Sequence, residues 1–255
     1  MKRLEVLRVT KSVYCVQRVE FLSCAYFVVT DGGVVLIDSG MDIDGEDMRL
    51  GLAEAGFDFP DVTSILITHW HNDHSTGAAA IVDASGAEVV CHAGSADRLA
   101  RRETASGLRR AIARLLPMRG FLSPMRGLLE LAPPRAVEST RHVKEGERVH
   151  NDFLVMETPG HIASHLSYFY EPEGVLFTGD AIAVARERVS FMSRFLTEDK
   201  TAARESMLRC IDLEADAYCP GHRAPLVNPS KEHLQRTRER VETMRWWPII
   251  GCGES

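Results

Sequence analysis

The pattern of hydrophobic and polar positions divides the first part of the chain into short β-strands and helices. Two β-rich runs, 25–29 and 34–37, flank Asp31-Gly32-Gly33, a typical hairpin turn. After them, the spacing of apolar positions predicts a helix over 46–55, a buried strand over 62–67, a helix from about 77 to 82, and a strand over 87–91. Such alternation indicates an α/β architecture with helices outside sheets.

The same pattern returns in the last part of the chain. It predicts a strand over 153–158, a hairpin of 165–170 with 175–177, a helix over 199–212, a strand over 215–219 and a final helix over 230–246. Ser230 is the expected N-cap of that helix. No internal repeat appears along the chain.

Residues 95–142 interrupt this alternation and resemble an insertion. A helix is expected over 98–116, followed by a proline-punctuated, strongly apolar stretch. The segment holds ten arginines and four acidic residues, a net charge of +6 in a chain of net charge −6. We expect either a lid that offers cations and apolar surface to a substrate, or a helical hairpin that packs on its own domain or on a second subunit of a homodimer.

Composition narrows the class of protein. With 255 residues, 45% of them hydrophobic and 26% charged, the chain has the profile of a soluble globular protein. No run approaches the roughly 20 apolar residues that span a bilayer. The six cysteines are scattered without a Cys-x-x-Cys pair, so we expect reduced thiols. Glu5 and Arg8 interrupt any apolar signal segment near the N-terminus, so we expect a cytoplasmic protein. The net negative charge argues against a nucleic-acid partner.

The most informative stretch is Thr68-His69-Trp70-His71-Asn72-Asp73-His74. It follows a β-branched, apolar run, so the histidines lie where a strand ends; there His69 and His71 point the same way, and a turn can bring Asp73 and His74 beside them. Neutral imidazoles and a carboxylate are ligands that zinc prefers. The alternative is a polar loop that happens to be rich in histidine.

Three more ligand-type residues follow predicted strands. His161, Asp180 and His222 stand in Pro159-Gly160-His161, Thr178-Gly179-Asp180 and Pro220-Gly221-His222. Asp38 follows the strand 34–37 in the same way, either as an acceptor that orients a ligand histidine or as a cap of its own turn. Loops at one sheet edge are where a rigid scaffold gathers functional side chains, so this recurrence predicts one site.

With these motifs, the chain resembles the metallo-β-lactamase fold superfamily, whose hallmark is His-x-His-x-Asp-His followed by His, Asp and His. The resemblance implies a single domain over 1–255 with a helical insertion at about 95–142, folded as an αβ/βα four-layer sandwich of two mixed β-sheets with outer helices. It also implies a dinuclear site, with two Zn²⁺ as the first choice and iron or manganese as alternatives. The implied ligands are His69, His71 and His161 for one ion, Asp73, His74 and His222 for the other, and Asp180 between them.

The implied activity is hydrolysis. In a two-metal site a shared hydroxide would attack an ester, thioester or lactone carbonyl, and Asp73 would also steer or receive a proton. The expected substrate is a small molecule, anionic and with an apolar tail. The alternative from another class is a mononuclear iron persulfide dioxygenase, which uses two histidines and an aspartate. A non-enzymatic descendant is disfavoured because no ligand position is lost.

Departures from individual branches narrow the substrate. Asp180 differs from metallo-β-lactamases proper, which usually lack the bridging aspartate. Only 33 residues follow His222, fewer than the glutathione-binding region of glyoxalase II-type thioesterases needs, and Ala183 stands where acyl-homoserine lactonases place a tyrosine. Two interpretations stay open for six polar or aromatic residues near these motifs: contact with the site, or structural packing. The six are Trp70, His92, His165, Tyr168, Tyr170 and Cys219.

Overall fold

The computed structural model describes residues 4–19, 21–101, 134–185 and 187–248. Its contacts divide the chain into two compact units. The first unit is formed by residues 1–8 and 12–142, and the second by residues 9–11 and 143–255. The helix expected over 98–116 cannot be followed past residue 101, because residues 102–133 lie outside the described part of the chain.

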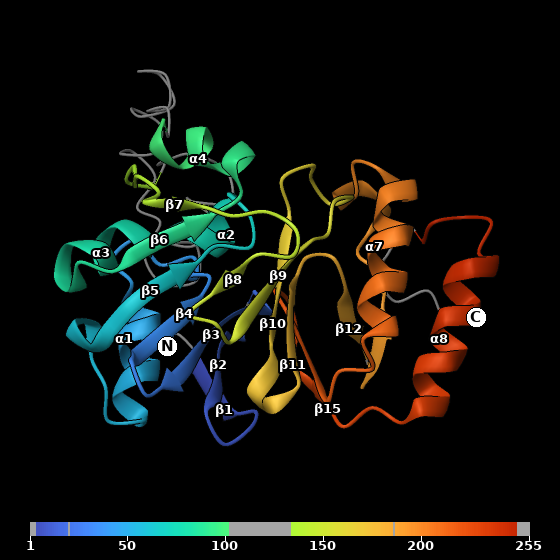
Figure 1. Ribbon diagram of the computed structural model, residues 1–255, viewed down its shortest axis with the longest axis horizontal. Coiled ribbons are helices and arrows are strands. Elements are labelled where there is room, and N and C mark those ends of the chain that lie inside the picture. The colour runs from blue at the N-terminus through green and yellow to red at the C-terminus, as the bar shows by residue number, and fades with distance from the viewer. Residues whose placement is uncertain (1–3, 20, 102–133, 186, 249–255) are drawn as a thin grey trace. The chain divides into compact units, whose positions relative to one another are not determined.

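The first unit is built on a seven-stranded sheet with its strands in sequence order (Figure 1). The strands β1 to β4 pair antiparallel, whereas β4, β5, β6 and β7 pair parallel, so the sheet is mixed. The carboxyl ends of β4 and β5 therefore lie at the same edge. The strands are β1 (Leu4–Arg8), β2 (Val13–Arg18), β3 (Ser23–Thr30), β4 (Gly33–Ile37), β5 (Val62–Leu66), β6 (Glu88–Cys91) and β7 (Arg141–His142).

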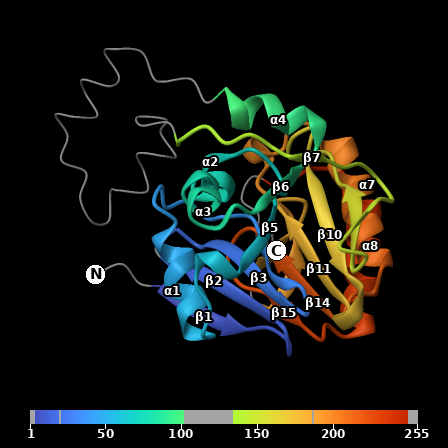
Figure 2. The same ribbon diagram turned by 60° about the vertical axis from the view of Figure 1, so that its left-hand side comes forward.

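Helices pack on one face of this sheet (Figure 2). Met48 and Leu52 of α1, Ile81 of α3 and Leu99 of α4 share one buried hydrophobic cluster with alternate residues of the strands, as expected for amphipathic helices on a sheet. Helix α3 ends at Gly86, which has a left-handed backbone. The helices are α1 (Glu46–Glu54), α2 (Asn72–Ser75), α3 (Ala78–Ser85) and α4 (Ala93–Ala100), with a 3₁₀ turn η1 (Phe59–Asp61).

The second unit holds a six-stranded sheet in the order β15-β14-β11-β10-β9-β8, and a separate hairpin of β12 with β13. Only β11 and β14 pair parallel among its described strands. Because β10 runs antiparallel to both β9 and β11, the strands β9, β11 and β14 all end at one edge. The strands are β8 (Arg148–Val149), β9 (Phe153–Glu157), β10 (Leu166–Tyr170), β11 (Val175–Gly179), β12 (Ala183–Ala185), β13 (Arg188–Ser190), β14 (Ala217–Pro220) and β15 (Leu226–Val227).

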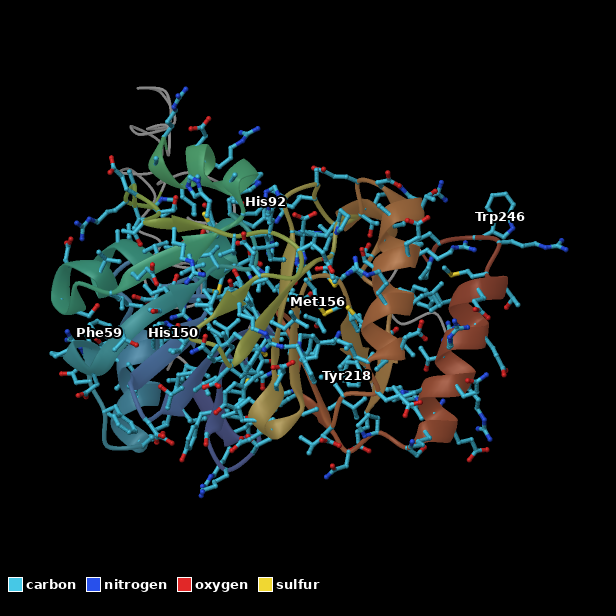
Figure 3. The ribbon with its side chains drawn as sticks, in the orientation of Figure 1. Phe59, His92, His150, Met156, Tyr218 and Trp246 are labelled. Atoms are coloured by element: carbon cyan, nitrogen blue, oxygen red, sulfur yellow. The ribbon has the colours of Figure 1, made fainter. Side chains whose placement is uncertain are left out.

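Two long helices, α7 (Lys200–Asp212) and α8 (Lys231–Thr243), complete the second unit, with the short turns η3 (Glu171–Glu173) and η4 (Arg194–Leu196). The Asp199 side chain caps α7 through the N–H groups of Thr201 and Ala202, and Ser230 caps α8. In Figure 3 the side chains of Met156 and Tyr218 lie between the sheet and α7, within the second buried cluster.

The predicted α/β class with two mixed sheets and helices is confirmed, and most predicted strands and helices agree with the structure within a few residues. The predicted start of the helix expected over 98–116 is wrong. Helix α4 begins at Ala93, where the His92 ring caps it, and ends at Ala100. The sequence pattern also missed the hairpin β12–β13, whose strands have three residues each and are too short for periodicity. Among the described residues, no helix is long and apolar enough to span a membrane.

Candidate metal centre

The first group of predicted ligands lies on the loop after β5 and on α2. His71 is the residue that precedes α2, and Asp73 and His74 lie within this four-residue helix. The His69 ring lies 4.7 Å from the His71 ring and 4.1 Å from the His74 ring, between centroids. The Nε2 atom of His74 is 3.7 Å from Oδ2 of Asp73. The local turn thus gathers three imidazoles and one carboxylate, as the sequence predicts.

Asp38 orients this group from the neighbouring parallel strand. It follows β4 with φ of 60°, a conformation that aspartate tolerates better than most residues. Its Oδ1 accepts a hydrogen bond from the Thr68 N–H, and its Oδ2 accepts from the Thr68 hydroxyl and from Nδ1 of His74, each at 2.8 Å. Because a carboxylate only accepts, Nδ1 of His74 carries the proton and Nε2 presents its lone pair.

Thr68 fixes the tautomer of His69 in the same way. Its hydroxyl proton is directed to Asp38, so the Thr68 oxygen accepts from Nδ1 of His69, 3.0 Å away. The lone pair of His69 is then on Nε2. Two imidazoles of the first unit therefore have the tautomer that a metal ligand requires, and one buried threonine and one buried aspartate enforce it.

The second group lies at the ends of β9, β11 and β14 in the second unit. Nε2 of His161 and Nε2 of His222 each lie 3.5 Å from Oδ2 of Asp180. Two ligand atoms at about 2.1 Å from a tetrahedral zinc ion are separated by about 3.4 Å. The observed separations fit ligands that share metal ions better than hydrogen-bonded pairs, which are shorter.

His161 is held by a contact that the sequence pattern did not reveal. Its Nδ1–H donates to the backbone carbonyl of Leu196 in η4, which leaves Nε2 as the atom nearest Asp180. The N–H groups of Glu198 and Asp199 donate to the carbonyls of His161 and Gly160. A segment some 35 residues away in sequence therefore fixes the ring, and no motif marks such a carbonyl.

His165 belongs to the support of this second group. It is fully buried, its Nε2 accepts from the backbone N–H of Asp180 at 3.0 Å, and its Nδ1–H points to the Thr158 hydroxyl at 2.9 Å. Thr158 in turn lies 2.8 Å from the Ser167 hydroxyl. The sequence left His165 between substrate contact and packing; its ring is instead a hydrogen-bonded bridge between two ligand loops.

The chain matches the family model of the metallo-beta-lactamase superfamily over residues 19–222, which contain every ligand position of both groups. The chain belongs to the metallo-beta-lactamase superfamily. The resemblance inferred from the motifs is thereby confirmed.

Relatives of this superfamily member include hydrolases. A hydroxyacylglutathione hydrolase of Cereibacter sphaeroides is 31% identical over 124 residues, 48% of this chain and 34% of the relative. The match thus spans about a third of that relative's length. The probable metallo-hydrolase YflN of Bacillus subtilis is 28% identical over 223 residues, 76% of each chain.

Solved structures share the fold. A metallo-beta-lactamase family protein from Thermus thermophilus has a TM-score of 0.62 and 22% identity, covering 92% of this chain and 81% of its own. A subclass B3 metallo-beta-lactamase of Bradyrhizobium japonicum has a TM-score of 0.65 and 20% identity, with coverage of 93% and 90%. At such identities the likeness concerns the fold alone.

The remaining aromatic and polar neighbours have structural partners in this superfamily member. The Trp70 ring packs partly into the first buried cluster and lies under the Arg98 guanidinium, 5.1 Å from its centroid. His92 accepts the Gly94 N–H as the cap of α4. Tyr168, Tyr170 and Cys219 are buried in their strands. These contacts support the packing interpretation of each of the five residues.

Proposed function

We propose that the two groups of ligands form one dinuclear metal site of a hydrolase that cleaves an ester, thioester or lactone bond. The observation that supports it is the pair of 3.5 Å separations between Oδ2 of Asp180 and the Nε2 atoms of His161 and His222, as expected for a carboxylate shared by two ions. The proposed ligands are His69, His71 and His161 for one ion and Asp73, His74 and His222 for the other, with Asp180 shared.

The chemistry of the donor set supports zinc. Five imidazoles and two carboxylates without a thiolate suit zinc first, and iron or manganese next. The contacts of Nδ1 with Asp38, Thr68 and the Leu196 carbonyl leave Nε2 of three histidines as the nitrogen that carries the lone pair. We propose two Zn²⁺ per chain.

In this proposal the protein's own residues orient the ligand histidines and accept a proton. Two bound cations lower the pKa of water and polarise a substrate carbonyl. We propose that Asp73, whose side chain is 15% exposed, receives a proton at a carboxylate oxygen during attack. Asp38 keeps His74 in one tautomer throughout, and the Leu196 carbonyl does the same for His161. The relatives named as hydrolases support hydrolysis as the reaction.

Metal analysis and a substrate panel test the proposal. We expect about two zinc ions per chain and metal-dependent cleavage of a thioester, ester or lactone. His71→Ala and Asp180→Ala should lose bound metal and activity together. His142→Ala is the matched control, because His142 is exposed and its ring bonds to Ser139, away from every proposed ligand in sequence. Hydrolysis that persists without metal contradicts the proposal, and one iron with oxygen uptake assigns the chain to the dioxygenase class instead.

The substrate class rests on the insertion. We propose a small anionic molecule with an apolar tail, bound with the help of residues 98–131, most of which lie outside the described part of the chain. Deletion of 98–131 should change the ratio of kcat/KM between charged and neutral substrates. An unchanged ratio would leave this segment as packing, within the domain or in a homodimer. We also propose a cytoplasmic location and a single domain over 1–255.

A further inference from the structure

A cavity of about 790 Å³ lies in the second unit and contains none of the proposed metal ligands. Its walls are the hairpin β12–β13, the segment 225–230 and one face of α8. Cavities of about 300–1,000 Å³ are typical of small-molecule sites. The proposed hydrolase chemistry does not use this cavity.

Basic side chains from two elements line it. Arg188 comes from β13, whereas Arg236 and Arg240 are four residues apart and therefore on one face of α8. The lining acids are Glu187 and Glu232, and Glu232 pairs with Arg236. The balance of the lining is positive in a chain with a net charge of −6. A guanidinium binds phosphate and carboxylate oxygens through paired N–H groups.

His233 shows that these charges converge. Its Nε2 accepts the Val189 N–H at 3.1 Å, which ties α8 to β13 across the cavity wall. Its pKa lies below the ordinary value, first because the ring is partly buried and then because Arg188 and Arg236 repel its charged form. Guanidinium groups of a strand and of a helix thus both lower the pKa of the same imidazole.

The segment 225–230 makes a mostly apolar part of the lining. It contributes Pro225, Leu226, Val227 and Pro229 together with the polar Asn228 and Ser230, and Val227 is 43% exposed. An occupant that contacts both the arginines and this segment carries an oxyanion and a hydrophobic body.

We propose that this cavity binds a small organic oxyanion, with its phosphate or carboxylate group on Arg188 and Arg236 and its apolar body against Pro225 to Pro229. The site is separate from the metal ligands in sequence and lining. It therefore offers a place for an effector or a product-like anion, and it does not depend on the hydrolase proposal.

Calorimetric titration of the metal-loaded protein with phenyl phosphate, benzoate and benzyl alcohol tests the site. We expect saturable binding of at least one anion and none of the neutral alcohol. Arg188→Ala and Arg236→Ala should each weaken binding about tenfold, the effect of losing roughly 1.4 kcal/mol. Glu232→Gln should strengthen it, because the carboxylate that competes for Arg236 is gone. Arg49→Ala removes an exposed arginine of the first unit and should change nothing.

The proposal is overturned if neither anion binds saturably, or if benzyl alcohol binds as tightly as the anions. Anion binding that survives both arginine variants but is lost in His71→Ala belongs to the metal centre and also overturns it. The arginines are exposed, so their removal should leave the melting temperature nearly unchanged.

Discussion

The Nε2 atom of His165 accepts a hydrogen bond from the backbone N–H of Asp180 at 3.0 Å. Its other nitrogen donates to Thr158, which lies just after β9 and three residues before His161. One buried imidazole therefore connects the loop that carries His161 with the loop that carries Asp180. Because Asp180 is the shared carboxylate of the proposed centre, the position of its backbone affects both ions.

His165→Ala should lower the affinity for metal about 10- to 100-fold, the usual cost of losing a group that orients ligands. His165→Gln should restore part of the affinity, because its amide can still accept the Asp180 N–H. Competition with a chelator measures the affinity. The melting temperature of the metal-free variants separates positioning from a general loss of stability: if affinity falls only in proportion to stability, His165 has no positioning role.

Asp38→Asn should remove the ion bound by His74 while leaving the other largely in place. Both oxygens of Asp38 accept hydrogen bonds, from two donors of Thr68 and from Nδ1 of His74. An amide turns one acceptor into a donor. If the amide nitrogen takes the place of Oδ1, it faces the Thr68 N–H, which is also a donor. If it takes the place of Oδ2, it donates to Nδ1 of His74 and forces the proton of that ring onto Nε2, the atom needed for the metal.

Metal content per chain measures this effect. We expect about one ion in Asp38→Asn against about two in the unsubstituted protein, together with a stability loss of about 1–3 kcal/mol for the unsatisfied buried group. Asp31→Asn is the control, because Asp31 is exposed in the β3–β4 turn. Full occupancy in Asp38→Asn would restrict Asp38 to capping its turn, the alternative that the sequence left open.

The sequence predicts the strand ends of the site well because ligand spacing and strand pattern reinforce each other. Asp180 and His222 follow apolar runs that form β11 and β14, and the parallel pairing of these strands brings their ends together. The Leu196 carbonyl could not be predicted, since a backbone group carries no sequence signal. The sequence left His165 between contact with the site and packing, and only the structure shows that its ring joins the two ligand loops.

Alkaline pH should destabilise the fold through Cys210. Burial raises the pKa of this thiol to about 12, from an ordinary value of 9.0. Below pH 9 the thiol is neutral in both states, so its burial costs nothing extra. Above that pH the unfolded chain ionises first, and the free energy of unfolding should fall by about 1.4 kcal/mol per pH unit for this group until its folded pKa is reached.

Urea denaturation at pH 7, 9 and 10 measures the slope of the free energy of unfolding against pH. Cys210→Ala should flatten it between pH 9 and 10, because the Tyr218 hydroxyl, whose pKa burial raises from 10.0, adds to the slope mainly above pH 10. Met207→Leu, a change at a buried neighbour without a titratable group, should keep the original slope. An unchanged slope in Cys210→Ala would mean that other groups dominate the alkaline transition.

Gly160→Ala should be among the most damaging small substitutions in the chain. Gly160 has φ of 137°, and a Cβ there would overlap the backbone N and Cα of Ala203 in α7. Backbone cannot rotate away as a side chain can, so the loop before His161 or the start of α7 must move. We expect a loss of at least about 3 kcal/mol in urea denaturation. Gly86→Ala is the matched control, with φ of 72° and no atom within 4 Å of the added carbon, and should cost about 1–2 kcal/mol of backbone strain. Equal losses in the two variants would show that left-handed strain, and not the contact with α7, requires glycine at position 160.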